Sequence, residues 1–192
     1  MNPLCHYREF AIQRLQLQHK VERQGQTYLQ VFAHKATDER VKQVILSACE
    51  NTHDRLNSLE SLLFSMNEVA QPVYPEATNG IVYEGLQQLE AESDPFTRDG
   101  IILQTLILLG EYKLGSYRIT ALYFQALEQE YPLYVTQSLL NNEEETLRKF
   151  SNLLTADMMN SSTKVQSPTQ SIRPRIRRKV MSNELFTRYQ EQ

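Results

Sequence analysis

Apolar residues recur at the three-to-four-residue spacing of an amphipathic helix through most of this 192-residue chain. The pattern predicts long helices over residues 7–34, about 38–67, about 95–128 and about 132–157, with a short helix at about 80–92. No alternation of apolar and polar residues is long enough to predict a strand. The fold is therefore expected to be all-α.

Local signals predict where these helices begin and how they are connected. Thr37 can cap the second helix, and Asp94 before Pro95 forms a strong start for the third long helix. Pro72, Pro75 and Gly80 mark a connection that is not a tight turn. We expect two antiparallel hairpins joined by a long crossover over residues 68–94, as in a ferritin-like four-helix bundle.

Each of the four long helices carries a charged residue within its own apolar stripe. Glu22, Lys113 and Glu143 have apolar residues on both sides at helical spacing, which favours an inward orientation. Glu50 and His53 lie toward one flank of their stripe, so both orientations stay open for them. Because unpaired buried charge is costly, the inward-facing charges should meet each other, a metal ion, or both.

A Glu-x-x-His pair on the second helix indicates metal chemistry. Di-iron and di-manganese bundles take one Glu from each of two helices and such a pair from each of the other two. Glu50 and His53 have the required spacing, and Glu22 supplies a lone carboxylate. The second half of the chain departs from this pattern, since no His follows Glu143 at that spacing and Lys113 stands where a carboxylate is wanted.

Lys113 gives a second interpretation of the centre. A buried ammonium group relieves repulsion between carboxylates as a metal would, so we predict that Lys113 forms an internal salt-bridge cluster and takes the metal's place. This interpretation is preferred, and no cofactor is expected. The competing class is a dinuclear oxidase or ferroxidase that would hold iron or manganese on Glu22, Glu50, His53, Glu143 and Glu111.

Charge divides the chain into an acidic body and a basic tail. Residues 158–192 hold seven basic and two acidic residues, whereas residues 1–157 hold thirteen basic and twenty-one acidic residues. The body is long enough for one well-buried core. The tail begins with a Ser/Thr-rich stretch, residues 160–172, of the composition typical of a linker. We therefore predict a bundle domain over residues 1–157 and a tail over 158–192.

The tail has two interpretations. Its basic run could attract nucleic acid or anionic lipid by charge alone. The favoured interpretation is docking to protein, either this bundle, a second copy or another chain, because Ser182 can cap a short helix with an apolar face that a purely electrostatic arm would not need. The predicted partner-binding residues are Arg173, Arg175, Arg177, Arg178, Lys179, Leu185, Phe186 and Tyr189.

Other function classes find little support in the sequence. There is no apolar run long enough to span a membrane and no signal-peptide pattern. Cys5 and Cys49 are expected to be free thiols, and the protein is expected to be cytoplasmic. The chain contains no Gly-rich phosphate loop, and the i, i+4 pair of Cys49 and His53 is better explained by packing than by nucleophilic catalysis.

Short motifs on the four long helices carry a family resemblance. They are Glu22, Glu50-Asn51-Thr52 after 28 residues, Arg98-Asp99, Gly110-Glu111-Tyr112-Lys113, Tyr117, and Leu140-Asn141-Asn142-Glu143. Over about two-thirds of its length the chain resembles the YciF-type ferritin-like stress proteins, bacterial four-helix bundles of unknown biochemical activity. The resemblance implies a pair of bound metal ions, but three carboxylates of that pattern are replaced here, by Gly110, Lys113 and Asn142.

These observations lead to one expectation about function. We predict a bundle of the YciF type with a degenerate central metal site, which acts as a structural or partner-binding protein rather than as an enzyme. The resemblance adds an association with stress physiology. The competing oxidase differs from this prediction mainly at Lys113, where a positive charge replaces a ligand.

Overall fold

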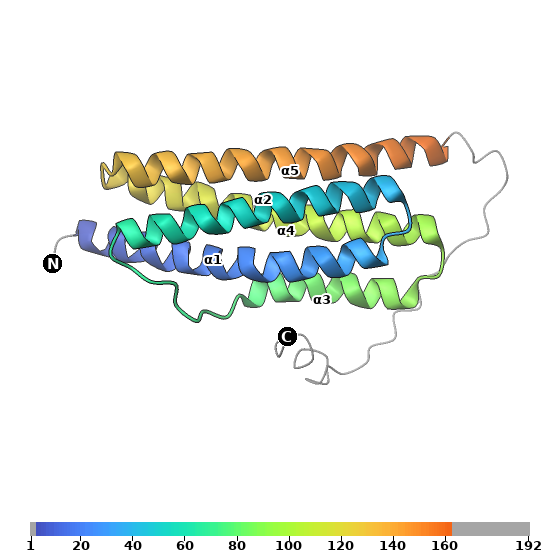
Figure 1. Cartoon of the computed structure of the whole chain (residues 1–192), viewed down its shortest axis with the longest axis horizontal. Coiled ribbons are helices and arrows are strands. Elements are labelled where there is room, and N and C mark those ends of the chain that lie inside the picture. Colours follow the sequence, from blue (N-terminus) through green and yellow to red (C-terminus); the bar gives the residue numbers. More distant parts are fainter. Residues whose placement is uncertain (1–2, 163–192) are drawn as a thin grey trace.

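The computed structural model describes residues 3–162, with side chains over residues 6–158, and in this part of the chain it is entirely helical (Figure 1). The helices are α1 (Pro3–Lys35), α2 (Glu39–Ser65), α3 (Glu76–Ala91), α4 (Pro95–Ala126) and α5 (Glu130–Ser162). The expected all-α class is confirmed. The short helix within the crossover begins earlier than predicted, at Glu76.

Two antiparallel hairpins form the bundle, as the sequence predicts. Helices α1 and α2 form one hairpin and α4 and α5 the other, while α1 also packs against α4 and α2 against α5. The connection from α2 to α4 passes along the outside of the bundle and includes α3, which packs on α4 (Figure 1). In this arrangement, the midpoints of the four long helices lie at about the same level along the bundle axis.

The helix ends follow the local sequence, with two corrections. Asp94 caps α4 by accepting a hydrogen bond from the backbone N–H of Thr97, and Pro95 stands in the first turn, as expected. The cap of α2 is Asp38 instead of Thr37, because Thr37 is bonded to another helix. Helix α5 runs to Ser162, beyond the predicted boundary at residue 157, so the start of the Ser/Thr-rich stretch is helical.

Arg98 and Asp99, in the first turns of α4, bind backbone groups of the neighbouring connections at one end of the bundle. The Asp99 carboxylate, 4% exposed, accepts hydrogen bonds from the backbone N–H groups of Thr37 and Asp38, each at 2.8 Å. Arg98 Nη1 donates to the carbonyl oxygens of Leu89 at 2.7 Å and Glu92 at 2.8 Å. The first turn of α4 therefore satisfies backbone groups at the α1–α2 turn and at the end of α3.

The core consists of two apolar clusters separated along the bundle axis. One cluster includes Phe32, Ile45 and Ile102 and extends to α3, while the other includes Leu15 and Phe124 near the opposite end. Between them lies a layer of buried polar and charged residues. These residues form the centre of the molecule.

Helix α3 approaches α4 closely because position 85 has no side chain. A Cβ atom added to Gly85 would overlap the side chain of Thr105 on α4. By contrast, a Cβ atom added to Gly100 would meet no atom within 4 Å. Gly85 thus has a packing role that Gly100 does not share.

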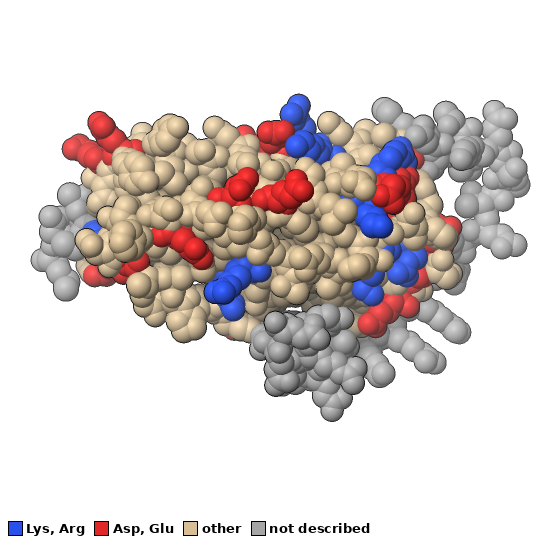
Figure 2. Space-filling view, viewed as in Figure 1, with Lys and Arg blue, Asp and Glu red and all other residues tan. Residues whose placement is uncertain are grey.

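The face of the molecule drawn in Figure 2 is mixed in charge. Figure 2 shows acidic and basic side chains interspersed on one face, with no continuous patch of either sign. Among the helices described, none is long and apolar enough to cross a membrane.

A buried ionic cluster as candidate functional site

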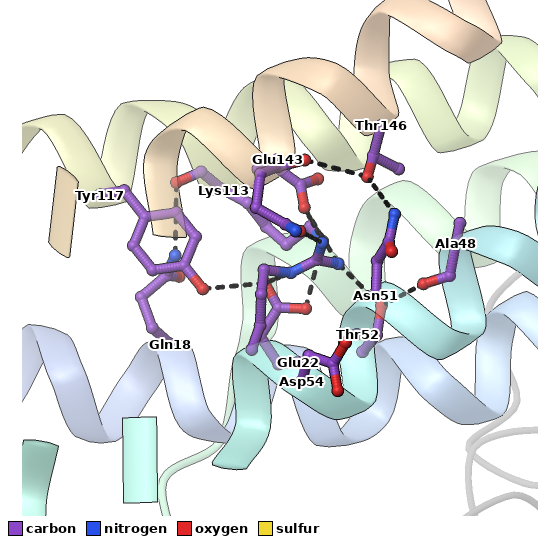
Figure 3. Close-up of polar contacts among 12 residues, drawn as sticks. Gln18, Glu22, Ala48, Asn51, Thr52, Asp54, Lys113, Tyr117, Glu143 and Thr146 are labelled. Carbon is purple, nitrogen blue, oxygen red and sulfur yellow. Dashed lines mark hydrogen bonds and ion pairs between the residues drawn. The ribbon is translucent and has the colours of Figure 1, made fainter. Parts of the chain in front are cut away.

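Four charged side chains, one from each long helix, meet in the polar layer. Lys113 Nζ lies 3.3 Å from Glu22 Oε2 and 2.8 Å from Glu143 Oε2, so the predicted ion pairs of Lys113 are confirmed (Figure 3). Arg55, from α2, lies opposite: its Nε is 3.2 Å from Glu22 Oε1 and its Nη2 is 3.1 Å from Glu143 Oε2. Two cations and two carboxylates therefore balance in charge.

All four groups are shielded from water. The exposed fraction is 0% for Glu22, 2% for Arg55 and Glu143, and 6% for Lys113. In such an environment each charge depends on its partners, because the loss of solvation is large and water cannot screen what remains.

Neutral polar groups add hydrogen bonds to two of the charged side chains, Glu22 and Arg55. Tyr117 donates its hydroxyl proton to Glu22 Oε1 at 3.0 Å (Figure 3). Arg55 donates to Asn142 Oδ1 at 2.6 Å and to Thr52 Oγ1 at 2.7 Å. Asn142 and Lys113, two of the positions that depart from the YciF-type pattern, thus contact members of the same cluster.

The third departing position, Gly110, also faces this layer. A Cβ atom at Gly110 would lie 2.9 Å from Leu147 Cδ1 and 3.3 Å from Glu143 Oε1. Real Cβ atoms essentially never come as close as the first distance, so the side chain of Leu147 would have to shift to admit any side chain at position 110. The space in which the pattern places a carboxylate is filled here by Leu147 and Glu143.

Burial and ion pairing have opposite effects on the pKa values of Glu22 and Arg55. Burial would raise the pKa of Glu22, but the charges of Arg55 and Lys113 and the hydrogen bond from Tyr117 outweigh it and lower the pKa below 4.5. Burial would likewise lower the pKa of Arg55, and the two carboxylates outweigh it and raise the pKa. Burial and the nearby charge of Glu22 raise the pKa of Tyr117 well above 10. At neutral pH, Glu22 and Arg55 are therefore charged and Tyr117 is neutral.

Three of the expected metal ligands do not reach this layer, which corrects the predicted ligand set. Glu50, His53 and Glu111 are exposed on the bundle surface. The i, i+3 spacing of Glu50 and His53 places them on one face of α2, as expected, but that face points to solvent. The inward face carries Thr52 and Arg55 in their place.

Arg55 is the central residue that the sequence reasoning missed. It lies seven residues after Ala48 and four before Leu59, both of which are buried on the inward face of α2. This spacing would have placed Arg55 in the stripe.

The donor set in the described residues does not fit a dinuclear metal centre. No group of three or more His, Cys, Asp or Glu side chains within the described part lies close enough together to hold a metal ion. Glu22 and Glu143 are the two carboxylates of the layer, and both are already neutralised by Arg55 and Lys113.

Two further predictions concern residues outside the cluster. Cys49 is a free, half-buried thiol whose pKa is raised by burial and by the charge of Glu50, which disfavours the nucleophilic thiolate. The predicted partner-binding residues between Arg173 and Tyr189 lie outside the described residues.

Comparisons with known proteins agree with this architecture. Residues 6–163 match the model of a domain of unknown function, DUF892. A structure of the stress protein YciF from E. coli superposes with a TM-score of 0.76 at 19% identity, covering 83% of this chain and 99% of that one. YcfI from Rhodopseudomonas palustris, described as a candidate structural protein, gives a TM-score of 0.73 at 17% identity, covering 76% and 92%. No curated protein matches the sequence.

Proposed function

Since the chain belongs to the DUF892 family of domains of unknown function, we propose that it is a structural or partner-binding bundle whose centre is held by its own cations. The observation that carries this proposal is the position of Arg55 and Lys113. Both lie between Glu22 and Glu143, within 3.3 Å of a carboxylate oxygen. The names of two similar structures, a stress protein and a candidate structural protein, support a role of this kind.

Electrostatics disfavours a metal ion at this position. A dication would meet two positive side chains, and a pair of unit charges about 4 Å apart repels by about 4 kcal/mol at an effective dielectric constant of 20. The carboxylates would first have to give up Arg55 and Lys113, leaving two buried cations without partners. The cluster therefore opposes metal binding in two ways: its two cations repel a metal ion, and they already pair with the carboxylates that would bind it.

The competing oxidase would require a different α2. The helix would have to rotate about its own axis, so that His53 points inward in place of Thr52 and Arg55. Such a rotation would expose the buried side chains of Leu56 and Leu59. This cost makes the structural or partner-binding role the better proposal.

An iron-oxidation assay tests the proposal against its competitor. Ferrous iron is added to the full-length protein in air, and oxygen uptake and ferric absorbance are followed together. The matched control is Glu22→Gln, which removes a central carboxylate. We expect both proteins to oxidise iron no faster than buffer, while oxidation that requires Glu22 would overturn the proposal in favour of an oxidase.

A further inference from the structure

An open groove lies on the outside of the bundle between α1 and α4. Its volume is about 570 Å³, and it is lined by Phe10, Gln13, Arg14, Gln16 and Leu17 of α1, Val73 of the α2–α3 connection, and Tyr123 of α4. The rings of Tyr7 and Phe10 lie 5.9 Å and 6.0 Å from that of Tyr123, measured between centroids. The groove therefore has an aromatic wall at one end.

The same pair of helices is covered by α3 further along the bundle. Figure 1 shows α3 beside the C-terminal half of α1, and Tyr28 of α1 donates a hydrogen bond to Asn79 of α3 at 2.7 Å. Beyond the start of α3, Phe10 and Ile119 remain 44% and 39% exposed. The apolar faces of α1 and α4 thus continue past the helix that covers them.

We infer that this groove is the docking site of the chain's own segment 182–191, bound as a short helix in the position beyond α3. Leu185, Phe186 and Tyr189 would form one face of such a helix, since positions i, i+1 and i+4 lie together. The stretch from Phe10 to Leu17 spans about 10 Å at 1.5 Å per residue, which matches two helical turns. This inference goes beyond the proposed function, and it gives the tail docking that the sequence predicts a definite surface.

Charge complements the apolar match. Arg14 lines the groove and has no ion-pair partner among the residues that the structure describes. In the proposed helix, Glu184, Arg188 and Glu191 fall on one flank, which carries a net negative charge. Either carboxylate can pair with Arg14 while the three apolar side chains enter the groove.

The chain is long enough to reach this site within one molecule. Helix α5 runs antiparallel to α4, so Ser162 lies about 48 Å along the bundle from the groove end, at 1.5 Å per residue. Residues 163–184 span up to about 75 Å when extended. The basic run, residues 173–179, would then pass over the acidic body, where opposite net charge favours close approach.

Disulfide trapping in the full-length chain tests the inference. Cys5 and Cys49 are replaced by Ser, and Gln190→Cys is combined with Gln13→Cys in the groove or with Asn57→Cys on the exposed face of α2 as the matched control. Mild oxidation is followed on gels and by peptide mapping, with circular dichroism to confirm the fold. The groove pair should close at least about ten-fold faster than the control pair, at a rate independent of protein concentration.

Each result has a defined meaning. Adding Phe186→Asp to the groove pair should lower its rate to that of the control pair. The inference would be overturned if the two cysteine pairs closed at equal rates, or if disulfides formed only between two chains. It would also be overturned if Phe186→Asp left the closure rate of the groove pair unchanged. Since no metal or partner is present in this experiment, its failure would leave the ion-paired centre and the iron-oxidation result untouched.

Discussion

Replacing Lys113 by Met removes one cation from the buried cluster while keeping a side chain of similar length. At an effective dielectric constant of about 20, the two contacts of Lys113, at 2.8 Å and 3.3 Å, contribute about 6 and about 5 kcal/mol of gross attraction. Burying the ammonium group costs several kcal/mol in lost hydration, which offsets much of this gain. We expect Lys113→Met to lower the free energy of unfolding by about 3–5 kcal/mol at pH 7, as for other broken buried pairs.

The pH dependence makes this prediction specific to the cluster. In the wild type, ion pairing holds the pKa of Glu22 below 4.5, so its stabilising effect persists above that pH and is lost on further acidification. Without Lys113, burial should raise the pKa of a central carboxylate above 4.5. A group with a raised pKa contributes its stability at low pH and loses it as pH rises, by about 1.4 kcal/mol per pH unit. The gap between variant and wild type should therefore shrink from pH 7 to pH 5.

Urea denaturation followed by far-UV circular dichroism measures both quantities. The matched control is Lys149→Met, which removes an exposed lysine that pairs with Glu145 on the same helix. This surface change should alter the free energy of unfolding by no more than about 0.5 kcal/mol. An unfolding midpoint of Lys113→Met equal to that of wild type, or a gap that is the same at pH 5 and pH 7, would refute the reasoning.

Three further predictions concern other parts of the structure. Asp99→Ala leaves two backbone N–H groups without acceptors and should cost about 2–4 kcal/mol in urea denaturation; a loss below about 0.5 kcal/mol would contradict the role of Asp99. Gly85→Ala should destabilise by about 1–3 kcal/mol through overlap with α4, whereas Gly100→Ala should stabilise by about 0.5–1 kcal/mol, and equal effects in thermal melts would contradict the packing argument. Deleting residues 163–192 should leave the helicity of the bundle intact but change its assembly or partner binding, measured by circular dichroism and light scattering; loss of helicity would make the tail part of the core.

Much of the fold could be predicted from the sequence because periodicity and caps are local signals. The Asp94-Pro95 start of α4 and the crossover around Pro72 and Pro75 can be recognised without tertiary information. The end of α5 could not, because its last turns continue into a Ser/Thr-rich stretch whose composition alone indicates a linker. Local sequence places the cap of α2 one residue early, because the contact that engages the Thr37 hydroxyl comes from Asp99, 62 positions away.

The centre was predictable where a charge lies in the middle of an apolar stripe. Glu22, Lys113 and Glu143 satisfy that condition, and the structure brings them together. A two-residue motif such as Glu50 and His53 fixes a common helix face but not the direction in which that face points. Packing of the whole helix decides the direction, and in α2 it directs Arg55 inward.

Metal content measures most directly whether the protein's own cations occupy the centre. The full-length protein is produced in medium supplemented with iron and manganese, purified without chelators, and analysed by elemental mass spectrometry. A Glu22→Gln, Glu143→Gln variant serves as the reference for metal held elsewhere on the chain. The account predicts well under one ion per chain and no difference between the two proteins, since Arg55 and Lys113 already neutralise both carboxylates. Two iron or manganese ions per chain, lost in the variant, would contradict it.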